Sequence, residues 1–213
     1  MIILHVGLPK TGTTFLQEEI FRKMNIKYIR DLNITSFATS DRKVIISHEG
    51  LSISDVFEPA YKKYMVAEYL KKIFPDAKII VGIRDKDSWL RSMYSQYIRN
   101  GGGGSYDYFI SHLDKEHLNF EKYINHLKML FNDVFVYKFE EIVSDKARVV
   151  KEMCDFIGEP VPDYRDKKYR VSLKPYQLRA LRFFNRILPY NVNRVFRYVV
   201  NMTSNSQPQE EVR

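Results

Sequence analysis

The chain has 213 residues, of which 45% are hydrophobic and 28% are charged, and its formal net charge is +8. This length and composition are expected for one globular α/β domain with a helical appendage. Its single cysteine, Cys154, excludes an internal disulfide framework, and no apolar run approaches the roughly 18 residues of a membrane-spanning helix. No secretory signal precedes the first strand, so we expect a cytoplasmic protein.

Short apolar runs alternate with helical patterns over most of the chain. The predicted strands are 2–6, 44–46, 78–83 and 134–137. The predicted helices are 13–24, 61–74, one capped by Asp87 that runs to about Asn100, 119–131, and one that begins at Ser144 or Asp145, runs to Ile157 and ends at Gly158. This order predicts an α/β, three-layer fold with a central parallel sheet of four to five strands flanked by helices. The glycine run at 101–104 predicts a flexible loop, either a surface connection or a lid beside the site.

The most informative segment is Gly7-Leu8-Pro9-Lys10-Thr11-Gly12-Thr13-Thr14, which follows the first strand directly. Its glycines have the spacing of a triphosphate-binding P-loop, G-x-x-x-x-G-K-[ST], and backbone amides at such a helix start bind anions. Position 13, where that loop needs lysine, is threonine, and the lysine stands at position 10. The segment therefore predicts a P-loop-type site for a phosphate-like group other than a triphosphate.

Polar residues also follow the later strands. His48 and Glu49 follow the second predicted strand, Arg84 follows the third, and Ser92 lies eight residues after Arg84. Ligands of open parallel sheets bind beyond the carboxyl ends of the strands, so we expect these side chains to meet the loop. Arg84 and Ser92 could together hold a second phosphate; taken singly, Arg84 could be a solvated strand end and Ser92 an ordinary helix residue.

The two motifs together resemble those of sulfotransferases that use 3′-phosphoadenosine 5′-phosphosulfate (PAPS), in particular the carbohydrate-modifying type. The resemblance covers roughly residues 1–160. It implies that the loop holds the 5′-phosphosulfate, that Arg84 and Ser92 hold the 3′-phosphate, that the product is adenosine 3′,5′-bisphosphate (PAP), and that no metal is required. The implied loop residues are Pro9, Lys10, Thr11, Gly12, Thr13 and Thr14.

The resemblance also implies the chemistry. Lys10 would neutralise charge on the bridging oxygen as the sulfuryl group leaves, and a base near 48–49 would accept the acceptor's proton. Glu49 is the first choice, because the resemblance to the carbohydrate-modifying type implies a carboxylate near this strand end, and its neighbour His48 is the second. Consecutive side chains of an extended segment point opposite ways, so we expect only one of the two to face the sulfate. A helix-capping or core role remains open for each. The other histidines have no metal-ligand spacing.

The C-terminal region concentrates the positive charge: residues 164–200 contain ten Lys or Arg and one Asp. The Gly-x-x-Gly-x-x-Lys segment of cytosolic relatives is missing, and Arg170 and Lys174 are possible substitutes. We predict a PAPS-binding domain over 1–175, a basic amphipathic helical extension over 176–202 and a disordered tail over 203–213. The extension either packs on the core with a solvated basic face or contacts an anionic membrane or acidic glycan.

The predicted function is transfer of a sulfuryl group from PAPS to a hydroxyl or amine acceptor, a carbohydrate or glycolipid. One alternative is a nucleoside or nucleotide kinase using Mg-ATP, which the missing lysine at position 13 disfavours. Another is a non-catalytic module that binds anions or membranes. Nucleic acid is not expected as a partner, and contact with a membrane would be peripheral.

Overall fold

The computed structural model describes residues 1–30, 43–52, 55–166, 169 and 173–188. The chain divides into two compact units. The described part of the first comprises 1–30, 43–52, 55–86 and 113–166, and that of the second comprises 87–112, 169 and 173–188. Residues 189–202, most of the predicted basic extension, and the predicted tail 203–213 lie outside the described residues, and the predicted domain bounds stay predictions.

The first unit is built on a five-stranded sheet in the order β2-β3-β1-β4-β5, and every neighbouring pair is parallel. The inner strands are almost wholly apolar and buried, as strands covered on both faces are. The predicted parallel sheet is therefore confirmed. The strands are β1 (Ile2–His5), β2 (Lys27–Ile29), β3 (Val44–Ser47), β4 (Lys78–Ile83) and β5 (Val134–Lys138).

Strand β2 was not predicted. Lys27-Tyr28-Ile29 is only three residues long and contains no apolar run, so its pairing with β3 decides its conformation. The remaining strands agree with the predicted ranges to within one residue at each end.

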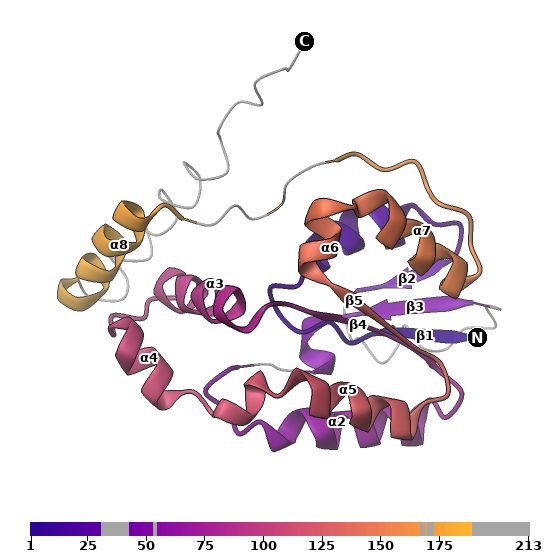
Figure 1. Ribbon diagram of the computed structural model, residues 1–213, viewed down its shortest axis with the longest axis horizontal. Helices are drawn as coiled ribbons and strands as arrows, with labels where there is room; N and C mark the ends of the chain where they lie inside the picture. The colour runs from indigo at the N-terminus through magenta and orange to yellow at the C-terminus, as the bar shows by residue number, and fades with distance from the viewer. Residues whose placement is uncertain (31–42, 53–54, 167–168, 170–172, 189–213) are drawn as a thin grey trace, which may run out of the picture. The chain divides into compact units, whose positions relative to one another are not determined.

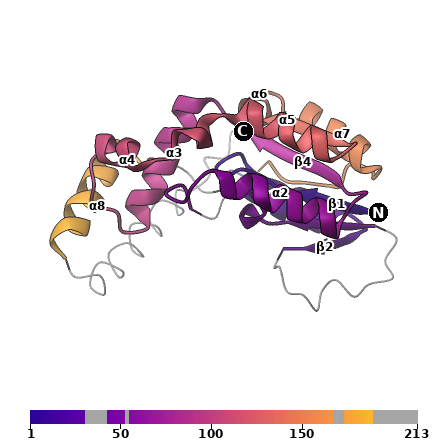
Figure 2. The same cartoon turned by 90° about the horizontal axis from the view of Figure 1, so that it is seen from below.

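Helices cover both faces of the sheet. Helices α2 (Tyr61–Ile73) and α5 (Phe120–Leu130) lie side by side on one face, and α6 (Phe139–Ser144) and α7 (Lys146–Ile157) lie on the other (Figure 1). Figure 2 shows α2 crossing in front of the strands. The result is the predicted three-layer α/β arrangement; α6 itself was not predicted.

The helix predicted over 13–24 is one continuous helical stretch made of three types of helix. It begins as α1 (Thr13–Phe15), widens into the π-helix η1 (Leu16–Ile20) and ends as the 3₁₀ turn η2 (Phe21–Lys23). The apolar spacing predicted the helix but not its hydrogen-bond register. π-Helical turns are rare in proteins, and those that occur are often found at functional sites.

The second unit contains α3 (Lys86–Arg99) from its second residue onward, α4 (Tyr106–His112) and α8 (Pro175–Ile187). Because α3 begins at Lys86, Asp87 lies in its first turn and is not the cap that was expected. Ile98, Leu173 and Leu181 form a small core in this unit. None of the described helices combines the length and the apolarity needed to cross a membrane.

The glycine run forms a loop, as predicted, and its backbone makes specific hydrogen bonds within the second unit. Gly104 accepts a hydrogen bond from the Tyr94 hydroxyl (3.1 Å) and donates its N–H to the Tyr97 hydroxyl (3.1 Å). The Asn185 amide of α8 donates to the Gly102 carbonyl (2.7 Å). The run is therefore a hydrogen-bonded part of the second unit. Tyr94 and Tyr97 lie on α3, and Asn185 lies 83 residues from Gly102 in the sequence. The composition of the run alone did not reveal these partners.

Candidate functional site

The loop after β1 is a tight turn with two left-handed residues, Lys10 (φ 69°) and Gly12 (φ 91°). The Thr11 hydroxyl donates to the Leu8 carbonyl (2.7 Å), and the Phe15 N–H donates to the Gly12 carbonyl (3.0 Å). Glycine adopts a positive φ without strain, but lysine does not. Strained residues of this kind cluster at active sites, where the surrounding structure holds them in place.

Inside this loop lies a buried hydroxyl that lacks a partner. Thr13 is 2% exposed, and its Oγ1 makes no hydrogen bond among the residues that the structure describes. A Cβ on Gly7 would come within 3.0 Å of this oxygen and 2.9 Å of His5 Nε2, so a side chain is excluded there. An unsatisfied buried hydroxyl is costly. At a helix start it suits an anionic ligand, which would also meet the first backbone amides.

A buried hydrogen-bond network lies beneath the loop. His5 Nδ1 is 2.6 Å from Ser47 Oγ, and His5 Nε2 is 3.2 Å from the Tyr137 hydroxyl. The Gln17 amide donates to the Ser47 carbonyl (3.2 Å) and lies 3.1 Å from Ser47 Oγ. The network therefore joins the ends of β1 and β3 to β5 and η1.

Sequence reasoning placed His5 correctly as a strand residue but missed this network. The sequence did show that His5 and Ser47 each end an apolar strand. In the structure the two strands are neighbours, and their register places His5 beside Ser47. Tyr137 gave no such signal, because an aromatic residue in a strand is ordinary.

His5 should make stability depend on pH. Burial lowers its pKa from 6.5 to about 3, so the folded protein holds the imidazole neutral. The unfolded chain takes up a proton near pH 6.5, and stability is therefore lost as the pH falls from that value towards 3. Between pH 7 and pH 5 this group alone should cost about 2 kcal/mol. Urea unfolding at both pH values should show this drop in the native chain but not in His5→Gln. Equal drops in the two proteins would remove His5 from the explanation.

Arg84, which follows β4, lies against the loop. Its Nη1 donates to the Lys10 carbonyl (3.1 Å), and its guanidinium carbon lies 4.2 Å from the centroid of the Phe139 ring. Burial lowers the pKa of Arg84, while Glu140 and Asp85 oppose the shift. Guanidinium groups stay charged in proteins, so Arg84 is a cation fixed beside the strained lysine.

The other predicted nucleotide contacts belong to the second unit or lie outside the described residues. Ser92 is half-buried in α3, in the second unit, and its predicted pairing with Arg84 stays a prediction. Lys174 is exposed just before α8, where its N–H donates to the Gln177 side chain (2.8 Å). Arg170 lies outside the described residues.

The two candidate bases have different surroundings. His48 precedes the 3₁₀ turn η4 (Glu49–Leu51), and its Nδ1 accepts the Gly50 N–H (2.9 Å). With that lone pair occupied, the neutral imidazole carries its proton on Nε2 and has no free lone pair. The half-buried Glu49 carboxylate makes no hydrogen bond to any described residue. The geometry therefore makes His48 a cap, and the assignment of the base to Glu49 stays a prediction.

Two observations place Glu49 near the loop. The Ser52 hydroxyl, at the end of η4, donates to the Gly7 carbonyl (3.1 Å). Burial raises the pKa of Tyr137, the Thr11 and Thr13 side chains oppose that shift, and the negative charge of Glu49 adds to it. Glu49 is therefore within electrostatic range of the hydroxyl below the loop.

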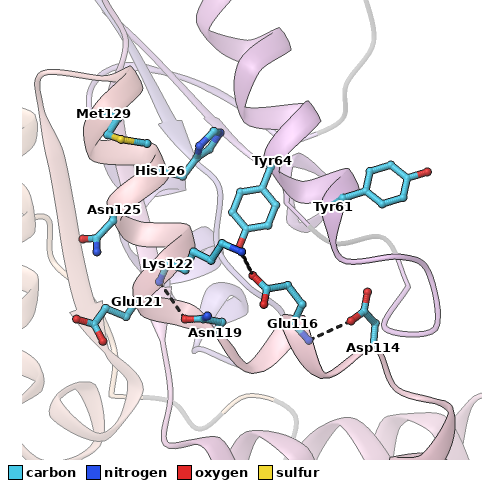
Figure 3. Close-up of a pocket in the computed structure, with 10 residues that line it drawn as sticks. All are labelled: Tyr61, Tyr64, Asp114, Glu116, Asn119, Glu121, Lys122, Asn125, His126 and Met129. Carbon is cyan, nitrogen blue, oxygen red and sulfur yellow. Dashed lines mark hydrogen bonds and ion pairs between the residues drawn. The ribbon is translucent and has the colours of Figure 1, made fainter.

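A hollow of about 680 Å³ in the first unit lies between α2, α5 and the 3₁₀ turn η5 (Lys115–Leu118) (Figure 3). Its polar groups mostly satisfy one another. Glu116 accepts from the Tyr64 hydroxyl (2.9 Å) and pairs with Lys122 (2.9 Å), and Asp114 accepts from the Ala60 and Glu116 N–H groups (2.8 and 3.0 Å). We interpret this hollow as structural.

The histidines away from the loop also have structural surroundings. The His117 ring lies 2.8 Å from the Glu58 carbonyl, His126 packs edge-on against Tyr64, and the exposed His112 stacks on Tyr108. In the described part of the chain, no three or more His, Cys, Asp or Glu side chains gather where they could hold a metal ion.

Comparison with known proteins decides the family. A family model described as the sulfotransferase family matches residues 55–163, which is half of the chain. The chain belongs to the sulfotransferase family. The matched stretch does not include the loop at 7–14, so the family assignment is independent of the motif that suggested it. A search of curated protein sequences finds no match.

Solved structures agree with this fold. The crystal structure of a sulfotransferase from Alicyclobacillus acidocaldarius is 17% identical, with a TM-score of 0.54, over 90% of this sulfotransferase and 98% of that chain. The crystal structure of mouse sulfotransferase SULT7A1 complexed with PAP is 19% identical, with a TM-score of 0.53, over 86% of this chain and 64% of that chain. At these identities the likeness concerns the fold.

Proposed function

We propose that this sulfotransferase transfers a sulfuryl group from PAPS to a hydroxyl or amine of a carbohydrate or glycolipid. The observation that carries the proposal is the loop: it presents a strained lysine and an unpaired buried hydroxyl, Lys10 and Thr13, in a chain of this family. The relative from mouse was solved with PAP, which supports PAPS as the donor here.

The loop residues fit the donor's phosphosulfate. Thr13 offers a buried hydroxyl donor, and the loop's backbone amides offer N–H donors at a helix start. The narrow turn at Gly12 and the buried Pro9 fix the path of the chain around that position, and Thr14 can add a second hydroxyl. Arg84, Ser92, Lys174 and Arg170 are the proposed contacts of the nucleotide part, with Arg84 the one described beside the loop.

In the proposed mechanism one side chain removes a proton from the acceptor, and another stabilises the negative charge on the leaving group. The donor supplies a sulfuryl group attached to a phosphate leaving group. Glu49 accepts the proton of the acceptor hydroxyl while the acceptor oxygen bonds to sulfur. Lys10 stabilises the negative charge that collects on the bridging oxygen as its bond to sulfur breaks. Transfers of this kind place charge on the moving and leaving groups, so fixed cations and amides dominate catalysis.

The family assignment argues against the two alternatives, a nucleotide kinase and a non-catalytic module. A screen with labelled donor tests the acceptor class, using sugars, glycolipids, amines and phenols as acceptors. We expect label in the saccharide or glycolipid products and loss of labelling in Lys10→Ala. Label that enters phenols only would contradict the proposed acceptor class, and transfer from labelled ATP instead would contradict the proposed donor.

A further inference from the structure

Helix α8, in the second unit, carries three different stripes along its length. Its packed stripe contains Leu178 and Leu181, which join the small core around Ile98, and Asn185, whose amide donates to the Ile98 carbonyl (2.7 Å). Leu181 is fully buried. This stripe fixes the helix on its own unit and leaves the opposite side available to solvent.

The second stripe is apolar and exposed. Tyr176, Phe183 and Ile187 are 65%, 59% and 57% exposed, and their spacing of seven and four residues places them within about 40° of one another around the helix. Isolated exposed apolar residues are ordinary, but three along one line of a 13-residue helix form a continuous apolar edge.

The third stripe is basic and adjoins the apolar edge. Arg179, Arg182 and Arg186 recur at three- and four-residue spacing and, with Phe183, line a hollow of about 330 Å³. Helix α8 contains no Asp or Glu, and the described residues provide no ion pair to any of these arginines. Three guanidinium groups that share one hollow repel one another, so the hollow favours an anionic partner.

We propose that α8 lies in the interface of an anionic lipid membrane, with Tyr176, Phe183 and Ile187 in the acyl boundary and the three arginines on the lipid headgroups. Charge complementarity selects the anionic surface, and the apolar edge beside the basic stripe selects a bilayer over a purely polar polyanion. A helix with an apolar face flanked by Arg, and too short and too charged to span, is typical of interfacial binding. This inference does not depend on the identity of the sulfuryl donor.

Co-sedimentation of the full chain with vesicles tests the charge requirement. We expect binding to phosphatidylserine–phosphatidylcholine vesicles at low salt, little binding to phosphatidylcholine alone, and release at about 1 M salt, where the Debye length falls to about 3 Å. Replacing Arg179, Arg182 and Arg186 by Gln should weaken binding roughly 100-fold. A matched control replaces the exposed Lys62, Lys72 and Lys151 by Gln; it removes the same charge from the first unit and should leave binding within about threefold.

Fluorescence tests insertion separately, in case the arginine variant binds poorly for another reason. The only native tryptophan, Trp89, is fully buried, so an added tryptophan reports its own surroundings. Phe183→Trp should shift its emission to the blue and be quenched by brominated lipid when anionic vesicles are added. Met129→Trp, at a 77% exposed position of α5, should change neither.

Three results would overturn the proposal. One is no binding to anionic vesicles at low salt. Another is unchanged binding after loss of the three arginines. The third is binding to heparin with no response of Phe183→Trp to vesicles, which would assign the stripe to an acidic glycan.

Discussion

Replacing Lys10 by alanine should lower the turnover of sulfuryl transfer roughly 10²- to 10³-fold, with little change in the stability of the fold. The ammonium group is proposed to meet charge that is larger in the transition state than in the bound donor, so its loss should appear in kcat more than in the affinity for PAP. The substitution should leave the backbone of the loop unchanged. Alanine meets the same steric cost as lysine at φ 69°, and the Lys10 carbonyl that accepts from Arg84 is retained.

The measurement is steady-state transfer from labelled PAPS together with a thermal unfolding curve. Lys86→Ala is the matched control, since Lys86 is an exposed lysine two residues from Arg84 and has no proposed contact with the donor. Near-normal turnover of Lys10→Ala would remove Lys10 from the chemistry. A large loss in Lys86→Ala would mean that net positive charge, and not the position of Lys10, is what matters.

Glu49→Gln should lower turnover roughly 10²- to 10⁴-fold, because the amide keeps the shape of the side chain but cannot accept a proton. His48→Asn should stay within a few-fold of the native chain. Asparagine is a good capping residue, and its Oδ1 can accept the Gly50 N–H as His48 Nδ1 does. Both variants are measured at saturating donor, so that the comparison concerns the chemical step.

The pair of variants distinguishes the two candidate bases. The opposite pattern, an active Glu49→Gln and an inactive His48→Asn, would assign the proton transfer to His48. Small effects in both would place the base on another residue. His48→Ala adds the capping loss, typically about 1 kcal/mol of stability, and its unfolding curve separates that effect from chemistry.

The sequence predicted the sheet and the loop because their signals are local. Val44–Ser47 and Lys78–Ile83 are apolar runs with a single interpretation, and the loop has two glycines and a lysine at a readable spacing. It also predicted the α7 ends correctly: the Asp145 side chain accepts from the Arg148 N–H, and Gly158 ends the helix in a left-handed conformation.

What the sequence did not reveal depends on hydrogen bonds that form only in the folded chain. The sequence placed Glu49 before His48 as the candidate base, but it did not show the hydrogen bond from the Gly50 N–H that makes His48 a cap. The network of His5, Ser47 and Tyr137 brings together residues more than 40 positions apart. The loop at 101–104 was predicted, but its hydrogen bonds with Tyr94, Tyr97 and Asn185 were not.

Calorimetry with PAP and with Mg-ATP tests the central claim most directly, that the loop at 7–14 serves a phosphosulfate nucleotide. We expect PAP to bind without added metal, more tightly than Mg-ATP, and to lose affinity in Arg84→Ala, which would remove a cation held beside Lys10. Preference for Mg-ATP, or equal and weak binding of both, would contradict the account.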